Sequence, residues 1–327
     1  MQQFTAIEYV QINIANAFGK DKMLWEHRIL WTATRSIEEL WDLVDEADDK
    51  ELYIAAVYML EDALAAKPSG GLIGLDATWS GLQIMGALIG CETTCLNVNV
   101  LDAGRRVDGY TDVNTILRKR TGIQYKRAET KDAAMPHYYG SVGEPQNLFG
   151  EDTPELEAFY KTLNGLYPGA EELRADLLSI IEDDALCYTW KLPDGHVAKC
   201  KVMSMQQATI TVGEVSFLYR AEVNAPNERD VSLLANVIHS IDGYIVREMI
   251  RRAHALGFAC FCVHDSFWCH PKYVGLMRQN YNNILADIHE ANIMQDIMRE
   301  LTGDQGLVFK QKSSFGVRIR KANYALS

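Results

Sequence analysis

The stretch that decides the fold of this chain reads Arg127-Ala-Glu-Thr-Lys131-Asp-Ala-Ala-Met135-Pro-His-Tyr-Tyr139-Gly140. Side chains four residues apart lie on one face of a helix, and twelve residues of helix span roughly 18 Å. The pattern therefore predicts one helical stripe with two cations at its start and an aromatic ring at its end. The cations suit a triphosphate and the ring suits a base or a sugar. Taken alone, such a stripe also fits a helix with two exposed cations and a core tyrosine.

Two segments that flank this stretch each end a predicted strand with an aspartate. The first reads Gly71-Leu-Ile-Gly-Leu-Asp76, and the second reads Phe258-Ala-Cys-Phe-Cys-Val-His264-Asp265. A single aspartate at a strand end is more often a turn former or a helix cap than a metal ligand. Two such carboxylates with a cationic helix between them in the sequence are what nucleotidyl transfer with two metal ions requires.

The composition is that of a globular protein with a large core. The chain has 327 residues, of which 48% are hydrophobic and 23% are charged. No run of about 18 apolar residues lacks charge, so we expect no membrane span. The seven cysteines have no framework spacing, which favours free thiols in a reducing compartment.

The formal net charge of −12 is unfavourable for binding nucleic acid, but the charge is unevenly spread. Residues 105–131 hold eight Lys or Arg against three acids, and residues 310–321 hold five against none. Residues 144–184 are strongly acidic. We expect the local potential near the basic stretches to matter more than the total.

Periodicity and turn residues predict the order of helices and strands. Helices are expected at residues 4–18, 24–30, 36–66 with a break near 48–50, 80–89, 111–121, from 153 onward, 169–182 and 232–252. Strands are expected at residues 72–75, 188–192, 196–202, 209–212, 215–219, 258–264 and 267–270.

Three ordered motifs resemble motifs A, B and C of the phage and mitochondrial single-subunit RNA polymerases. They are Asp76-x4-Gly-Leu-Gln, Arg127-x3-Lys-x7-Tyr-Gly and His264-Asp-Ser-Phe. Further segments resemble the family in the expected order: residues 14–22, 190–195 (Trp-x2-Pro-Asp-Gly) and 239–243 (His-Ser-Ile-Asp-Gly). The resemblance covers roughly residues 9–135 in outline and residues 185–275 well.

The resemblance implies an α+β fold, namely a right-hand polymerase palm with a small antiparallel sheet and helices, plus mainly helical fingers. Residues 1–100 would form the first part of the palm with motif A. Residues 101–187 would form the fingers with motif B. Residues 188–327 would form the second part of the palm with motif C and the C-terminal segment.

The resemblance also implies roles for the metal and phosphate ligands. Asp76 and Asp265 would bind two Mg²⁺ ions, with the carbonyl of Ala77 as a further ligand. Arg127 and Lys131 would bind the incoming triphosphate, and Lys131 would assist the leaving group.

Sugar selection would rest on three further residues. Tyr139 and His239 are similar to the pair that senses the ribose 2′-hydroxyl in this family. Family A DNA polymerases share several of these motifs, but a glutamate usually closes the space that Gly81 leaves open here. We therefore expect ribonucleotides as substrates. Arg35 would match a phosphate-contacting lysine of the family, and His264 would be structural.

Several departures from the family pattern bear on how the template is handled. Asp132 stands where the family often has a basic residue. Pro136 is expected to kink the motif B helix because it lacks a backbone donor. Asn114 is aligned with an active-site tyrosine of the family. The acidic segment 144–184 is shorter than the corresponding part of the fingers.

Complete members of the family carry a long N-terminal domain and a thumb before the palm. Here the palm-side likeness begins within the first twenty residues. We expect a natural catalytic subunit whose partner chain supplies the missing parts, a heterodimer like the split enzymes of some phages. A fragment of a longer chain is the alternative.

The implied partners are a DNA template, an RNA product, ribonucleoside triphosphates and the second subunit. The N-terminal residues lack a secretion or import signal, so we expect a cytoplasmic protein, in the host cell if phage-encoded.

Two other functions remain open from the sequence. The chain could be a family A-like DNA polymerase or primase, or a non-catalytic polymerase-like module that binds nucleic acid. A predicted hairpin near residues 201–219 fits either a promoter-reading loop or an ordinary structural hairpin.

Overall fold

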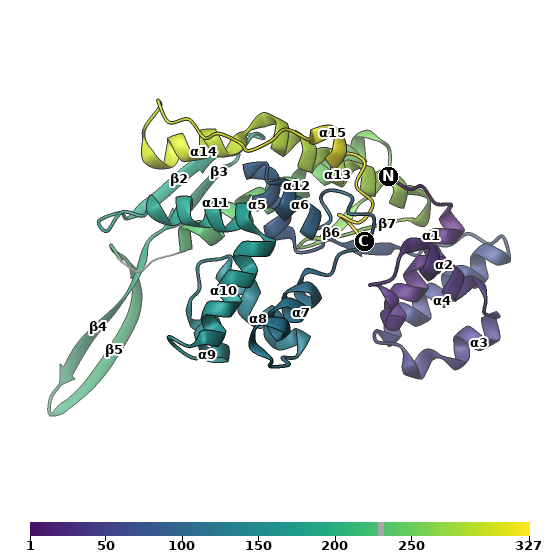
Figure 1. Ribbon diagram of the computed structural model, residues 1–327, viewed down its shortest axis with the longest axis horizontal. Coiled ribbons are helices and arrows are strands. Elements are labelled where there is room, and N and C mark those ends of the chain that lie inside the picture. The colour runs from purple at the N-terminus through teal and green to yellow at the C-terminus, as the bar shows by residue number, and fades with distance from the viewer. Residues whose placement is uncertain (228–231) are drawn as a thin grey trace.

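The computed structural model describes residues 1–227 and 232–327 and has the α+β architecture that the sequence predicted (Figure 1). Its α-helices are α1 (Ala6–Ala15), α2 (Trp25–Ala33), α3 (Ile37–Asp42), α4 (Lys50–Leu64), α5 (Ser80–Ile89), α6 (Glu92–Asn97), α7 (Gly109–Thr121), α8 (Arg127–His137), α9 (Gly143–Phe149), α10 (Pro154–Leu166), α11 (Pro168–Ser179), α12 (Ser232–Ala255), α13 (Val274–Ala291), α14 (Ile293–Thr302) and α15 (Gly316–Ile319). Its strands are β1 (Ile73–Asp76), β2 (Cys187–Lys191), β3 (Val197–Lys201), β4 (Met203–Val212), β5 (Val215–Asn224), β6 (Phe261–Val263) and β7 (Ser266–Cys269).

A small antiparallel sheet in the order β1-β7-β6 carries both predicted aspartates. In the β1–β7 pair, Leu75 faces Phe267 and Asp76 faces Ser266. Leu75 and Phe267 are buried, whereas Asp76 is exposed at the strand end. The alternation of a strand thus anchors the sheet in the core and leaves the carboxylate at its rim.

Helix α5 directly follows β1 and lies in the centre of the molecule (Figure 1). Every residue from Gly81 to Ile89 is buried, as expected for a helix that is apolar on all sides. Its one buried polar side chain is Gln83, which sits in motif A. The amide of Gln83 donates to the carbonyls of Val98 and Ala325, and its oxygen accepts from the Tyr281 hydroxyl. Gln83 therefore ties the C-terminal segment to the core.

We expect Gln83→Leu to lower the free energy of unfolding by about 3 kcal/mol, because it leaves the Val98 carbonyl and the Tyr281 hydroxyl buried without partners and removes one of the two donors to the Ala325 carbonyl. Urea denaturation measures this loss. The double variant Gln83→Leu/Tyr281→Phe should lose less stability than the two single variants added together, because it removes both partners of the Tyr281–Gln83 hydrogen bond. The exposed Gln207→Leu is the control, with an effect within about 0.5 kcal/mol. A Gln83→Leu protein as stable as the unmodified chain would contradict this role.

The N-terminal helices form a group at one end of the molecule, and local capping explains where they begin (Figure 1). Thr5 with Glu8 forms a capping box at α1, and Ser36 with Glu39 forms one at α3. The predicted break in residues 36–66 is present, with Asp49 as the N-cap of α4. Helices α7 to α10 lie below the sheet in Figure 1 and come from the segment expected to form the fingers. The proposed division into residues 1–100, 101–187 and 188–327 stays a prediction.

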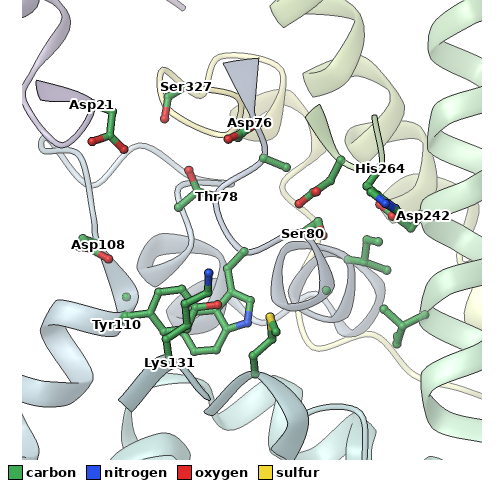
Figure 2. Close-up of a pocket in the computed structure, with 18 of the residues that line it drawn as sticks. Asp21, Asp76, Thr78, Ser80, Asp108, Tyr110, Lys131, Asp242, His264 and Ser327 are labelled. Carbon is green, nitrogen blue, oxygen red and sulfur yellow. The ribbon is translucent and has the colours of Figure 1, made fainter. Parts of the chain in front are cut away.

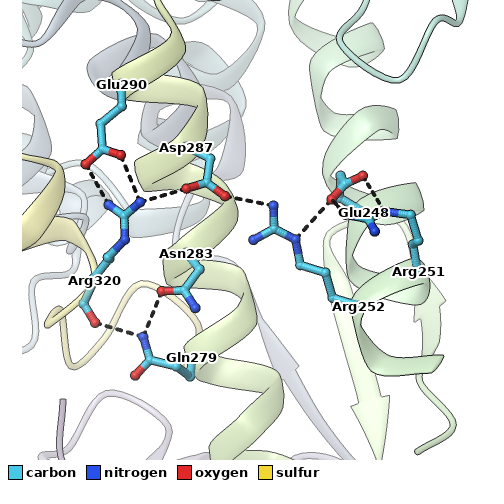
Figure 3. A network of polar contacts seen from close by, with 8 residues as sticks. All are labelled: Glu248, Arg251, Arg252, Gln279, Asn283, Asp287, Glu290 and Arg320. Atoms are coloured by element: carbon cyan, nitrogen blue, oxygen red, sulfur yellow. Dashed lines mark hydrogen bonds and ion pairs between the residues drawn. The ribbon is translucent and has the colours of Figure 1, made fainter. Parts of the chain in front are cut away.

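An ion-pair network holds α12 against α13 and the C-terminal segment (Figure 3). Arg252 bonds Glu248 within α12 and reaches Asp287 of α13. Arg320 bonds Asp287 and Glu290. These groups are partly exposed, so each pair contributes at most about 1 kcal/mol. The Arg252–Asp287 pair links α12 to α13, and Arg320 links α13 to the C-terminal segment.

Strands β4 and β5 form a long hairpin that projects from the body (Figure 1). It is longer than the sequence predicted, and nearly all of its side chains are exposed. Both interpretations of this hairpin stay predictions. No helix in the described residues is long and apolar enough to span a membrane.

Candidate functional site

One cavity of about 460 Å³ brings together most of the predicted site residues (Figure 2). Its lining includes these predicted residues: Asp76, Ala77, Gly81, Arg127, Lys131, Tyr139, His239, His264 and Asp265. They come from β1 and the residue after it, α5, α8 and the segment just beyond its end, α12 and the turn before β7. Segments far apart in the sequence therefore meet in one site.

The two strand-end aspartates are neighbours across the β1–β7 pair. Asp76 faces Ser266, the residue after Asp265. The amide of Ala77 donates to the carbonyl of Asp265 over 3.1 Å. His264 adopts a left-handed backbone with φ 54°, which forms the tight turn that presents Asp265. The backbone therefore brings Asp76 and Asp265 next to each other, as the predicted metal site requires.

This pair of carboxylates fits Mg²⁺, which is commonly bound by one or two carboxylates together with substrate phosphates and water. Among the described residues, no group of three or more His, Cys, Asp or Glu side chains could hold a metal without such help. A site built on Asp76 and Asp265 would therefore be completed by substrate.

A third acid, Asp242 of α12, also lines the cavity. Burial, and then the negative charge of Asp265, raise the pKa of Asp242 to about 6, while His264 opposes the shift. The sequence reasoning quoted this residue within the His-Ser-Ile-Asp-Gly segment but gave it no role. Figure 2 shows Asp242 and His264 together on one side of Asp76.

The opposite side of the cavity is cationic. Arg127 makes a two-point ion pair with Asp108, each N–O distance being 2.9 Å. Its bonds to Asp108 raise the pKa of Arg127, and Arg127 in turn helps to lower the pKa of Asp108 against the effect of burial. Arg127 and Lys131 both lie over the ring of Tyr110, at 5.3 and 6.0 Å. Two cations are thus held side by side before any substrate binds.

Tyr110, and not Asn114, occupies the position of an active-site ring. The Tyr110 ring stacks on Trp79 with centroids 4.1 Å apart. Asn114 lies one turn further along α7, and its buried amide donates to the carbonyl of Tyr125. Tyr110 therefore supplies an aromatic ring to the cavity one helical turn before Asn114, which does not line it.

Helix α8 ends earlier than the predicted stripe. It runs through Pro136 to His137, and Tyr139 lies just beyond its end. The amides of Tyr139 and Ser141 both donate to the carbonyl of Pro136, which closes the helix. Tyr139 nevertheless lines the same cavity as the two cations.

Tyr139 and His239 form a stacked pair with ring centroids 4.9 Å apart and planes 20° apart. Burial raises the pKa of Tyr139, and burial followed by His264 lowers the pKa of His239. A Cβ on Gly81 would lie only 2.9 Å from the Tyr139 hydroxyl. Glycine at this position therefore keeps open the space beside the pair.

Arg35 lies apart from the cavity, contrary to the role that we expected for it. Its guanidinium lies 4.2 Å from the ring of Trp31 and donates to the Trp31 carbonyl. It lines a separate depression beside Glu39 and Asp42. The cation that the N-terminal helices bring to the cavity is instead Lys22, which precedes α2.

The sequence reasoning missed several cavity residues. They are Asp21, Lys22, Trp79, Arg106, Asp108, Tyr110 and Ser327. Asp21 and Lys22 are the last two residues of segment 14–22, which resembles the family. That resemblance could have indicated that these two residues lie at the site. Arg106 lay in the basic run 105–131 but had no motif to single it out.

A palm-like sheet with paired carboxylates facing a cationic helix is the arrangement of the single-subunit polymerase class. The profile of the family described as DNA-dependent RNA polymerase matches residues 3–139 and 197–322. The chain therefore belongs to the DNA-dependent RNA polymerase family, of the single-subunit phage and mitochondrial type.

A curated relative supports the same assignment. The chain is 22% identical to "DNA-directed RNA polymerase 1, mitochondrial" of Arabidopsis thaliana over 364 aligned residues. The match covers 90% of this chain and 36% of the relative, so the chain spans about a third of that protein's length.

Proposed function

We propose that this chain is the catalytic subunit of a DNA-dependent RNA polymerase, which adds ribonucleotides to an RNA 3′ end on a DNA template. The supporting observation is that Asp76 and Asp265, at neighbouring strand ends, share one cavity with Arg127 and Lys131. Carboxylates at one side and cations at the other match the charge distribution of a metal-bound triphosphate.

Asp76 and Asp265 would hold two Mg²⁺ ions, with the carbonyl of Ala77 as a further ligand. Bound Mg²⁺ would neutralise charge at the attacking and leaving oxygens of an in-line displacement. Arg127 and Lys131 would bind the triphosphate, and Lys131 would donate a proton to the departing pyrophosphate. Tyr110 keeps these two cations adjacent through contacts with its ring.

Primer extension tests this proposal directly. The chain, supplied with its partner if one is needed, should extend an RNA primer on DNA with ribonucleotides and Mg²⁺. A clear preference for deoxynucleotides would indicate the DNA polymerase alternative. Binding of primer and template without extension by any preparation would favour the non-catalytic module.

We expect Tyr139→Phe to reduce the preference for ribonucleotides about ten-fold, because the hydroxyl that faces the sugar is lost. The stacking on His239 is retained in this variant, so RNA synthesis itself should persist. The measurement is the ratio of kcat/KM for ATP and dATP. Tyr138→Phe is the matched control, since Tyr138 is buried outside the cavity. Equal ratios for the two variants would refute the assignment of Tyr139.

We also propose that a second chain completes the enzyme as a heterodimer. The match spans 36% of the relative, and the remaining parts would come either from such a partner or from further residues of this same protein. Co-expression with the product of the neighbouring reading frame, followed by gel filtration, would detect the complex. Full transcription on single-stranded and double-stranded templates by the chain alone would argue against a partner.

A further inference from the structure

Arg106 is a cation of the cavity to which the proposed mechanism gives no task. It lies in the segment between α6 and α7 and lines the cavity. Its Nε donates to the hydroxyl of Ser327 over 3.3 Å. Within the described residues, no carboxylate lies close enough to form an ion pair with it. By contrast, the adjacent Arg105 is exposed and bonds Asp112 at 2.8 Å.

The charge of Arg106 is poorly compensated. Burial lowers its pKa most, whereas Asp21 and Asp108 act from a distance to raise it. Arg127 adds repulsion. The nearby Arg28 is also affected by positive charge. Burial, and then the charge of Arg106, lower the pKa of Arg28 to about 9. A half-buried guanidinium without an ion-pair partner is costly, so an anion in the cavity would stabilise it.

The neighbouring cations already have partners. Arg127 is held by Asp108, Lys22 bonds Asp21, and Arg28 bonds three protein oxygens. Among the residues that the structure describes, only the Nε of Arg106 is hydrogen-bonded, which leaves its terminal amino groups for a ligand. Two-point binding of a phosphate by a guanidinium needs such donors.

The position of Arg106 within the cavity indicates which part of a ligand it would meet. In Figure 2, Ser327, Asp21 and Asp108 lie on one side of Asp76, and Asp242 and His264 lie on the other. Arg106 bonds Ser327 and therefore lies on the first side. The sugar-sensing Tyr139 is influenced by Asp242, on the second side. A triphosphate that crosses the paired aspartates would thus extend toward Arg106.

We infer that Arg106 binds the terminal phosphates of the incoming nucleotide and the pyrophosphate that is released. This inference rests on the proposed function for the identity of the nucleotide. It adds a third phosphate-binding cation to the two proposed above, Arg127 and Lys131, all of which line the cavity.

The test uses inorganic tripolyphosphate as the probe, measured by calorimetry on the full chain without added metal. Arg106→Gln should weaken its binding about ten-fold, and Arg106→Lys should restore part of the affinity. Arg105→Gln is the matched control, because it removes the same charge one residue away outside the cavity. The affinity of the Arg105→Gln variant for tripolyphosphate should stay within about two-fold of that of the unmodified chain. If Arg106→Gln lowers the Tm, the binding measurement is made instead on Arg106→Met, which keeps the aliphatic volume of the side chain.

Three outcomes would overturn or separate the claims. Equal tripolyphosphate affinity in the Arg105 and Arg106 variants would overturn the inference. The inference would also be overturned if Ser327→Ala lowered the affinity and the Tm as much as Arg106→Gln, since that result would show that Arg106 acts through its bond to Ser327.

In extension assays, Arg106→Gln should raise the KM for nucleotide and the inhibition constant for pyrophosphate about ten-fold. A preserved binding difference without any RNA synthesis would refute the proposed function while leaving the phosphate site standing.

Discussion

Asp265→Asn should reduce the rate of nucleotide addition by about a thousand-fold or more. The change removes one of the two carboxylates that would hold Mg²⁺ at the β1–β7 rim, and metal ions supply several kcal/mol of charge stabilisation to such a transition state. About 4 kcal/mol corresponds to a thousand-fold change in rate. The backbone should be unaffected, because the contact with Ala77 uses the carbonyl of residue 265 and not its side chain.

Single-turnover extension of a labelled primer with saturating ribonucleotides measures this effect. Asp76→Asn should behave alike, since both carboxylates line the same cavity. Asp45→Asn is the control, because Asp45 is a highly exposed surface residue, and it should retain the full rate. An Asp265→Asn enzyme that extends primers within ten-fold of the unmodified rate would defeat the metal-ligand assignment.

Lys131→Gln is expected to lower kcat about 100-fold to 1000-fold, the range set by loss of a cation at a transferring phosphoryl group. Lys131 lies beside Arg127 over the Tyr110 ring, so it faces the side of the cavity where phosphates would bind. Lys119→Gln removes an exposed lysine of α7 and should leave kcat unchanged.

Lys131→Arg separates the two roles proposed for this side chain. Arginine keeps the charge but does not release a proton near neutral pH. If Lys131 donates a proton to pyrophosphate, the arginine variant should recover the KM for nucleotide but not kcat. Full recovery of both constants would reduce the role of Lys131 to charge alone.

Local signals predicted most elements of the fold. Thr153 followed by Pro154 predicted the start of α10, and the structure begins the helix there. The hairpin around Pro193-Asp-Gly195 was likewise expected and is present as β2 and β3. The length of β4 and β5 was underestimated because exposed strands lack the alternation of apolar residues that marks a half-buried strand.

The errors at the site have one physical cause. Arg35 was chosen by its place along the chain, and a shift of a few residues on a helix moves a side chain to a different face. Arg35 lies against Trp31, and the α7 ring that lines the cavity is that of Tyr110, one turn before Asn114.

The sequence by itself predicted the two strand-end aspartates, the cationic helix between them and most elements up to residue 270, because these features depend on short-range patterns. It did not predict α6, α9 or the helices α13, α14 and α15 that follow β7. Only the tertiary structure decided that Asp242, Asp108 and Arg106 face the same cavity. Their convergence depends on how α12, the α6–α7 segment and the C-terminal residues pack together. Spacing along the chain carries little information about such contacts, since they join residues on separate elements.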